Sequence, residues 1–153
     1  MTIPRPRSIP GEAEWTGREG DFDVRFAYRL YFGKTTDEVM YEFREHASER
    51  ALELRLAPRP VFQYYVFAFV DLFASPGESV EQAECAIAFL RLLRDREQSD
   101  PGSVKEIYAE LRPTVEHVTD NQSFYDADRD IYGDFRDLAA QLATLCASSD
   151  ARR

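Results

Sequence analysis

The sequence predicts a mainly α fold: a compact, single-domain bundle of about six helices around one buried helix. Three observations lead to this prediction. Residues 61–74 form an almost uninterrupted apolar and aromatic run. Three capping-box pairs, in which a serine or threonine precedes a glutamate or glutamine by three residues, lie outside this run. Between these signals and the Pro/Gly breaks, apolar residues recur every three or four positions, which is the period of an α-helix.

The run at 61–74 is interrupted only by Gln63 and Asp71. On helical spacing its apolar side chains cover nearly every side, as in a helix buried in the middle of a protein. Aromatic and β-branched residues also favour strands, but the run is longer than the usual strand. It is also shorter than the roughly 20 residues needed to span a bilayer. We therefore expect a central, buried helix here.

Residues 21–32 fit either a strand or a helix that is buried on two sides, because their apolar residues suit both periods. No later segment offers a pairing strand with turn signals, and a lone strand is unstable. A helix that ends near Gly33 is therefore predicted. The capping box at Thr35 then starts a helix over about 36–56, which a Pro-Arg-Pro segment ends.

Three further helices complete the predicted bundle, over about 80–98, 104–118 and 128–147. Pro113 is expected to kink or break the second of them. The stretch 119–128 between the last two is predicted to be a loop.

One domain is the expected count for 153 residues. Prolines, glycines and arginines dominate residues 1–20, which predicts a flexible N-terminal arm with Trp15 pinned to the domain. The predicted helical domain covers 21–147, and residues 148–153 are expected to fray.

The formal net charge of −9 restricts the partners of the chain. It opposes binding to nucleic acids and anionic membranes, which are polyanions, and favours a basic partner. Cys85 and Cys146 lack the spacing of a disulfide framework or zinc knuckle and fit small apolar side chains in a reducing compartment. No apolar signal segment is visible, so the expected location is cytoplasmic.

The acidic, aromatic stretch 124–134 is the most distinctive local feature. Its aspartates begin with the spacing of a calcium loop, but the positions that need a glycine and a bidentate glutamate hold other residues. Asp126 and Asp128 would cap a helix N-terminus, or the carboxylates and the tyrosines would form a surface for a basic partner. The candidate partner-binding residues are Tyr125, Asp126, Asp128, Asp130, Tyr132 and Asp134.

The two histidines suggest an alternative site. Glu42, His46 and Glu49 share a helix face, and His117 has acidic neighbours. If these helices met, their side chains would hold a metal ion. However, neither the Glu-x-x-His pattern of di-iron bundles nor a His-Glu-x-x-His motif occurs. No other cofactor is indicated.

Arg50 lies in the middle of an apolar helix stripe, and Asp71 lies inside the central run. Because a buried charge needs a partner, a structural ion pair between them is expected. The alternative is that Arg50 faces a cleft and binds an anionic ligand.

No nucleophile elbow and no Gly-rich phosphate loop occurs, which favours a non-enzymatic role. The best-supported function is that of a small acidic helical protein that binds another protein. Its most concrete form is an immunity- or antitoxin-type inhibitor that neutralises a basic partner. The alternatives are a metal-dependent enzyme or small-molecule-binding domain, and a structural or assembly subunit with aromatic oligomer contacts. The sequence does not indicate the oligomeric state.

Overall fold

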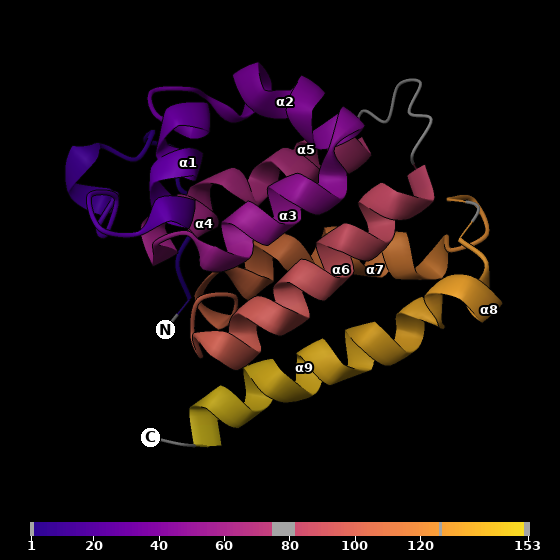
Figure 1. Cartoon of the computed structure of the whole chain (residues 1–153). Helices are drawn as coiled ribbons and strands as arrows, with labels where there is room; N and C mark the ends of the chain where they lie inside the picture. The colour runs from indigo at the N-terminus through magenta and orange to yellow at the C-terminus, as the bar shows by residue number, and fades with distance from the viewer. Residues whose placement is uncertain (1, 75–81, 126, 152–153) are drawn as a thin grey trace.

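The computed structural model of the chain describes residues 2–74, 82–125 and 127–151. These residues contain helices and no strand, which confirms the predicted mainly α bundle (Figure 1). In chain order the elements are the 3-10 helix η1 (Glu12–Glu14), α1 (Phe22–Tyr31), α2 (Thr36–Glu45), α3 (Ala47–Leu56), α4 (Arg59–Tyr65), α5 (Phe67–Ala74), α6 (Gln82–Ser99), the 3-10 helix η2 (Lys105–Ile107), α7 (Tyr108–Asp120), α8 (Arg129–Tyr132) and α9 (Phe135–Ala151). Within this described part, no helix is both long and apolar enough to cross a membrane.

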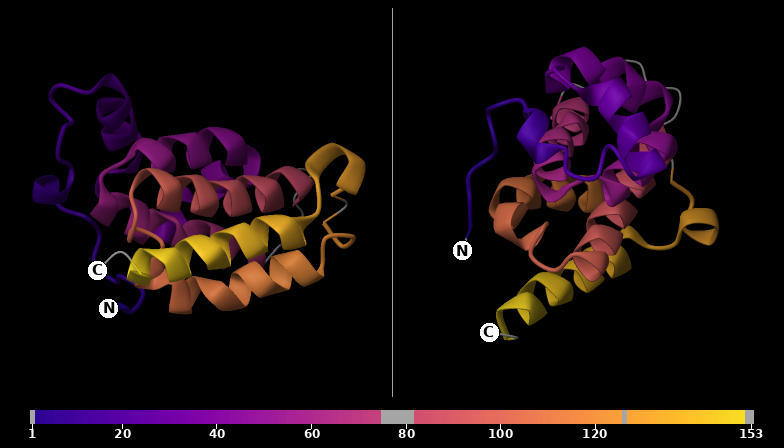
Figure 2. Two further views of the ribbon diagram at one scale, coloured as in Figure 1. Left: turned by 90° about the horizontal axis from the view of Figure 1, so that it is seen from below. Right: turned by 60° about the vertical axis from the view of Figure 1, so that its left-hand side comes forward.

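Helix α6 holds the two halves of the bundle together. It packs against α3 on one side and α9 on the other, and α9 also packs against α7 (Figure 2). On the far side of this arrangement, α5 contacts both α2 and α7. The core therefore lies between the N-terminal helices and the α6–α7–α9 group.

The predicted buried centre is confirmed, but it consists of two helices rather than one. Residues 61–69 are all buried, while α4 ends at Tyr65 and α5 begins at Phe67. At the junction the amide of Phe69 donates to the carbonyl of Val66, three residues back instead of four. Helix α4 packs against α3, whereas α5 packs against α2 and α7. The break thus lets one apolar run contact two different groups of helices.

Helix α1 confirms the helix predicted for 21–32. Its N-terminus is capped by Asp21, whose carboxylate accepts from the amides of Asp23 and Val24 at 2.9 and 3.2 Å. After the helix, Gly33 adopts a φ of 77°, a conformation that glycine reaches without steric cost.

The helix predicted over 36–56 is divided into α2 and α3. The capping box forms as predicted: the Glu38 amide donates to Thr35 Oγ1 (3.2 Å), and the Thr35 amide donates to Glu38 Oε1 (2.9 Å). The division falls at His46, whose φ of −135° and ψ of 50° lie outside the helical region. As a result α2 packs on α5, while α3 packs on α6.

Two further expectations concern the C-terminal half. Helix α7 continues through Pro113, which excludes the predicted break, while the predicted kink stays a prediction. The helix predicted for 128–147 is divided by Gly133, which has a φ of 77°, into α8 and α9. The capping box predicted at Ser79 lies outside the described residues.

The capping box predicted at Ser103 does not form, and a carboxylate of α6 binds the neighbouring amides. Glu97 on α6 is 1% exposed. Its oxygens accept from the amides of Gly102, Val104 and Lys105 at 2.7–3.0 Å. A buried carboxylate of α6 therefore satisfies three amides near the start of η2. The two amides of the predicted box, those of Ser103 and Glu106, donate to the carbonyls of Asp100 and Gly102 instead.

The N-terminal segment contacts the helices at both of its ends. The amide of Ile3 donates to the carbonyl of Glu106 (2.7 Å). Trp15 is fully buried, and its ring packs edge-on against Tyr28 with 5.4 Å between the ring centres. These contacts hold the N-terminal segment against the helices.

A buried arginine closes the C-terminus of α3. Arg96 is 5% exposed, and its Nη1 atom donates to three backbone carbonyls. They belong to Leu54, Arg55 and Ala57, at 2.6–3.1 Å. Carbonyls at the end of a helix lack intrahelical hydrogen-bond donors. The guanidinium of Arg96, on α6, is therefore the donor for these carbonyls of α3 and the residue after it.

Asp100 gives stability that depends on pH. Its carboxylate accepts from Arg59 and from Arg96, and these hydrogen bonds lower its pKa below the ordinary value of 3.8. A carboxyl whose pKa is lower in the folded state stabilises the fold above its unfolded pKa and loses that effect as the pH falls. We expect Asp100→Asn to weaken the dependence of the unfolding free energy on pH between about 5 and 3.

Urea unfolding at several pH values measures this effect. The exposed Asp37→Asn, which also removes one carboxylate, serves as the matched control. Equal slopes for Asp100→Asn and the wild type would contradict the role assigned to Asp100.

Candidate protein-binding site

The segment between α7 and α9 projects from one end of the molecule (Figure 1). Its short helix α8 stands beside the start of α9 and lies within the acidic stretch 124–134 singled out in the sequence. Apart from the exposed cation Arg129, we define the α8 projection as the exposed or half-exposed carboxylates of this segment together with its exposed large apolar side chains. They are Phe124, Asp128, Asp130, Ile131 and Asp134.

One buried side chain holds the projection in place. Gln122 is 3% exposed. Its Nε2 donates to the carbonyls of Ala127 (3.0 Å) and Gly133 (2.7 Å), and its Oε1 accepts from the amide of Phe135 (2.9 Å). The amide group therefore ties both ends of the α8 segment to the start of α9. Nothing in the sequence distinguishes this glutamine from an exposed one.

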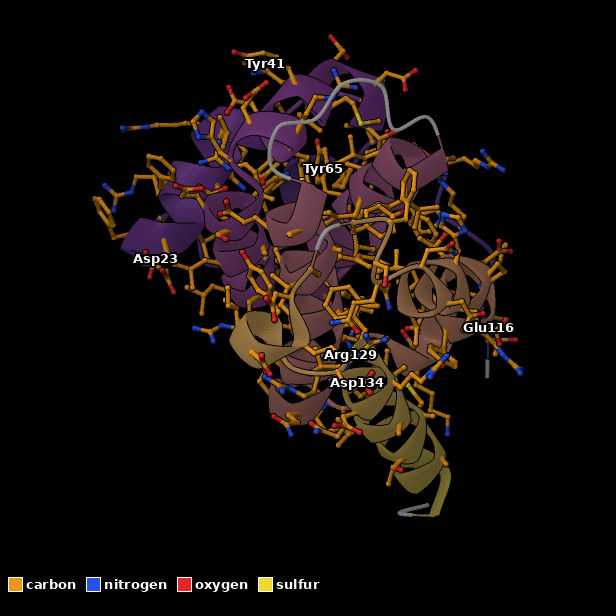
Figure 3. The ribbon with its side chains drawn as sticks, turned by 90° about the vertical axis from the view of Figure 1, so that its right-hand side faces the viewer. Asp23, Tyr41, Tyr65, Glu116, Arg129 and Asp134 are labelled. Carbon is orange, nitrogen blue, oxygen red and sulfur yellow. The ribbon has the colours of Figure 1, made fainter. Side chains whose placement is uncertain are left out.

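Two carboxylates of the projection also cap helices. Asp128 accepts from the amide of Asp130 (2.7 Å), and Asp134 accepts from the amide of Arg136 (2.9 Å). Figure 3 shows Asp134 beside Arg129, with 3.9 Å between carboxylate oxygen and Nε. The capping interpretation is thus confirmed for Asp128, and Asp134 caps the start of α9 in addition. A capping carboxylate still keeps its charge, so it remains available to attract a cation.

The apolar part of the projection is unusually exposed. Ile131 is 71% exposed and Phe124 is 61% exposed. Large apolar side chains at the surface, surrounded by polar groups, are typical of interaction sites. The sequence analysis assigned no contact role to either residue, since periodicity alone does not reveal which apolar side chains remain outside the core.

The two tyrosines that were predicted as contact residues are buried or half-buried. Tyr125 is only 2% exposed, and its ring packs edge-on against Phe73 with 5.5 Å between the ring centres. Burial raises the pKa of its hydroxyl. Its assignment to the surface is therefore wrong, because the ring is a core residue. Tyr132 is half-buried against the core, and Asp126 lies outside the described residues.

The predicted metal ligands do not converge. His46 separates α2 from α3, and His117 lies on α7, where its ring packs edge-on against Tyr125. Across residues 2–74, 82–125 and 127–151, no three His, Cys, Asp or Glu side chains are grouped to hold a metal. Glu42 instead pairs with Arg50, and Glu49 is exposed. The alternative metal site has no geometric basis in this part of the chain.

The predicted ion pair between Arg50 and Asp71 is also wrong. Arg50 binds Glu42 and Glu53, with shortest N–O distances of 2.9 and 2.8 Å. Asp71 accepts two hydrogen bonds of 2.7 Å from Arg5 in the N-terminal segment. Each charge is paired as expected for a buried position, but with a different partner.

A groove of about 730 Å³ lies between α7 and α9. Alanines of α9 form much of its floor, and Cys146 lies in its wall. Burial raises the pKa of the Cys146 thiol to about 12, so the thiolate needed for nucleophilic chemistry is scarce at neutral pH. This agrees with Cys146 as a small apolar side chain.

Comparison of the chain with protein families, with curated proteins and with solved structures finds no match. A functional assignment therefore rests on the helical scaffold and on the chemistry of its surface.

Proposed function

We propose that this chain is a protein-binding protein that uses the α8 projection to bind a basic partner. Its most concrete form is an immunity- or antitoxin-type inhibitor that neutralises that partner. The observation that carries the proposal is the exposure of Ile131 and Phe124 among the carboxylates of one projection. Apolar anchors within a polar rim are the usual composition of a protein interface.

The distribution of charge supports a basic partner. From the start of α7 at Tyr108 to Asp137 there are eight carboxylates and three arginines. This segment thus carries five of the nine net negative charges of the chain. A concentrated field of one sign steers an oppositely charged protein and raises its rate of association.

The fixed backbone of the projection is a second supporting feature. Gln122 and the capping carboxylates Asp128 and Asp134 hold the segment through side-chain-to-backbone hydrogen bonds. A surface that is ordered before binding loses less conformational entropy when its partner arrives.

The proposal is tested with two variants that keep the caps. In Asp128→Asn/Asp130→Asn/Asp134→Asn the charges are removed, while asparagine remains a good N-cap. In Ile131→Ala only the apolar anchor is removed. The matched control Asp37→Asn/Glu45→Gln/Glu49→Gln removes the same charge from exposed positions elsewhere.

Each protein is used as bait in native lysate at low and moderate salt, and the captured proteins are identified by mass spectrometry. We expect one basic protein to bind the wild type and the control, to be lost with both projection variants, and to bind less at higher salt. Equal capture by the projection variants and the control would show that another surface binds it.

A further inference from the structure

A second surface of unusual chemistry lies at the other end of the molecule, on the outer side of α1. We define the α1 face as Phe22, Arg25, Phe26 and Arg29. Their spacing places them on one side of the helix, opposite the side that is buried through Val24, Ala27 and Tyr31. Phe22 is 75% exposed and Phe26 is 50% exposed. This face is therefore aromatic and cationic, in a chain that is acidic as a whole.

The arginines around this face are oriented by neutral groups. Arg25 Nη2 donates to the carbonyl of Glu19 (3.2 Å). The neighbouring Arg18 donates to the carbonyl of Glu12 (2.8 Å) and lies over the ring of Tyr28, 5.1 Å from its centre. A carbonyl fixes the direction of a guanidinium but leaves its full charge in place.

These charges also lack carboxylate partners. Within the described residues, none of Arg18, Arg25 and Arg29 forms a salt bridge. Together with Tyr28 and one carboxylate, Glu19, they line a hollow of about 400 Å³. Three cations and one anion give this hollow an excess of positive charge, which suits a ligand group that carries carboxylates.

We propose that the α1 face receives the α8 projection of a second copy of this chain. The inference rests on the proposed function because it names a partner for the same projection. Phe22 and Ile131 are the two most exposed large apolar side chains in the described part of the chain. Phe22 shares its helix face with Arg25 and Arg29, and Ile131 lies in the segment that carries Asp128, Asp130 and Asp134, so the two surfaces match in both apolar character and charge.

The positions of the two surfaces determine the kind of assembly. Helices α1 and α8 lie at opposite ends of the bundle in both Figure 1 and the left view of Figure 2. A contact between different surfaces at opposite ends is heterologous, so each added copy leaves one free surface of each kind. The expected product is a concentration-dependent series of head-to-tail oligomers. A basic target protein would compete with this assembly for the α8 projection.

Sedimentation velocity of the full chain over a wide concentration range tests the inference at physiological ionic strength. Two variants each block one surface: Arg25→Glu/Arg29→Glu on the α1 face, and Asp128→Asn/Asp130→Asn/Asp134→Asn with Ile131→Ala on the projection. Circular dichroism establishes that both are folded. We expect the wild type to form oligomers beyond the dimer, and each variant alone to be monomeric.

The mixture of the two variants is the decisive sample. Each variant keeps one intact surface, so the pair should form a 1:1 dimer and nothing larger. A wild type that is monomeric at every concentration, or a mixture that contains no dimer, would overturn the inference. In those cases the proposed function still stands if the projection variants lose a basic target in the capture experiment, and it falls separately if they do not.

Discussion

Replacing Arg96 with alanine should lower the free energy of unfolding by about 3–5 kcal/mol, the range expected when a buried, hydrogen-bonded charge is removed from its partners. Three carbonyls at the end of α3 would lose their common donor. The guanidinium also lies over the ring of Phe62, 5.0 Å from its centre, and this contact would disappear as well. Urea unfolding followed by circular dichroism measures the change.

The matched control is Arg91→Ala, which lies on the exposed side of the same helix. It should change the unfolding free energy by less than about 0.5 kcal/mol. If Arg96→Ala and Arg91→Ala had equal effects, the structural role assigned to the Arg96 guanidinium would be wrong.

Replacing Gln122 with alanine should lower the free energy of unfolding by about 3 kcal/mol, because three hydrogen bonds are lost and buried backbone groups are left without partners. It should also release the α8 projection. Amide hydrogen exchange should therefore accelerate in 127–135 more than in α3 or α6. Unfolding measurements and exchange mass spectrometry test the two effects separately.

Gln141→Ala provides the control, since this side chain is exposed on α9, and it should change neither property measurably. Unchanged exchange in 127–135 after Gln122→Ala would show that other contacts hold the projection.

The sequence predicts the helical class well because its signals are local. Apolar periodicity, the Thr35 capping box and the prolines after Leu56 all act within one or two turns. The breaks at Val66 and His46 are not predicted, because the packing of each half against different helices decides them. Tertiary contacts of this kind override local propensity.

The candidate site is predicted only in part, for a similar reason. The acidic stretch is visible in the sequence, but burial decides which of its aromatic and apolar residues reach the surface. Tyr125 is in the core and Ile131 is exposed. Gln122 and Arg96 form hydrogen bonds with backbone groups on other segments. Every residue carries a backbone carbonyl, so the sequence does not identify these partners.

The most direct test of the proposed function is the affinity of the purified basic partner for the wild type, for Ile131→Ala and for Asp128→Asn/Asp130→Asn/Asp134→Asn. Binding through the α8 projection predicts that Ile131→Ala weakens binding by about tenfold or more, as expected for an apolar anchor at the centre of an interface. It also predicts that the neutralised variant binds more slowly and with a weaker dependence on salt. Affinities equal to that of Asp37→Asn/Glu45→Gln/Glu49→Gln would show that the partner binds elsewhere on the molecule.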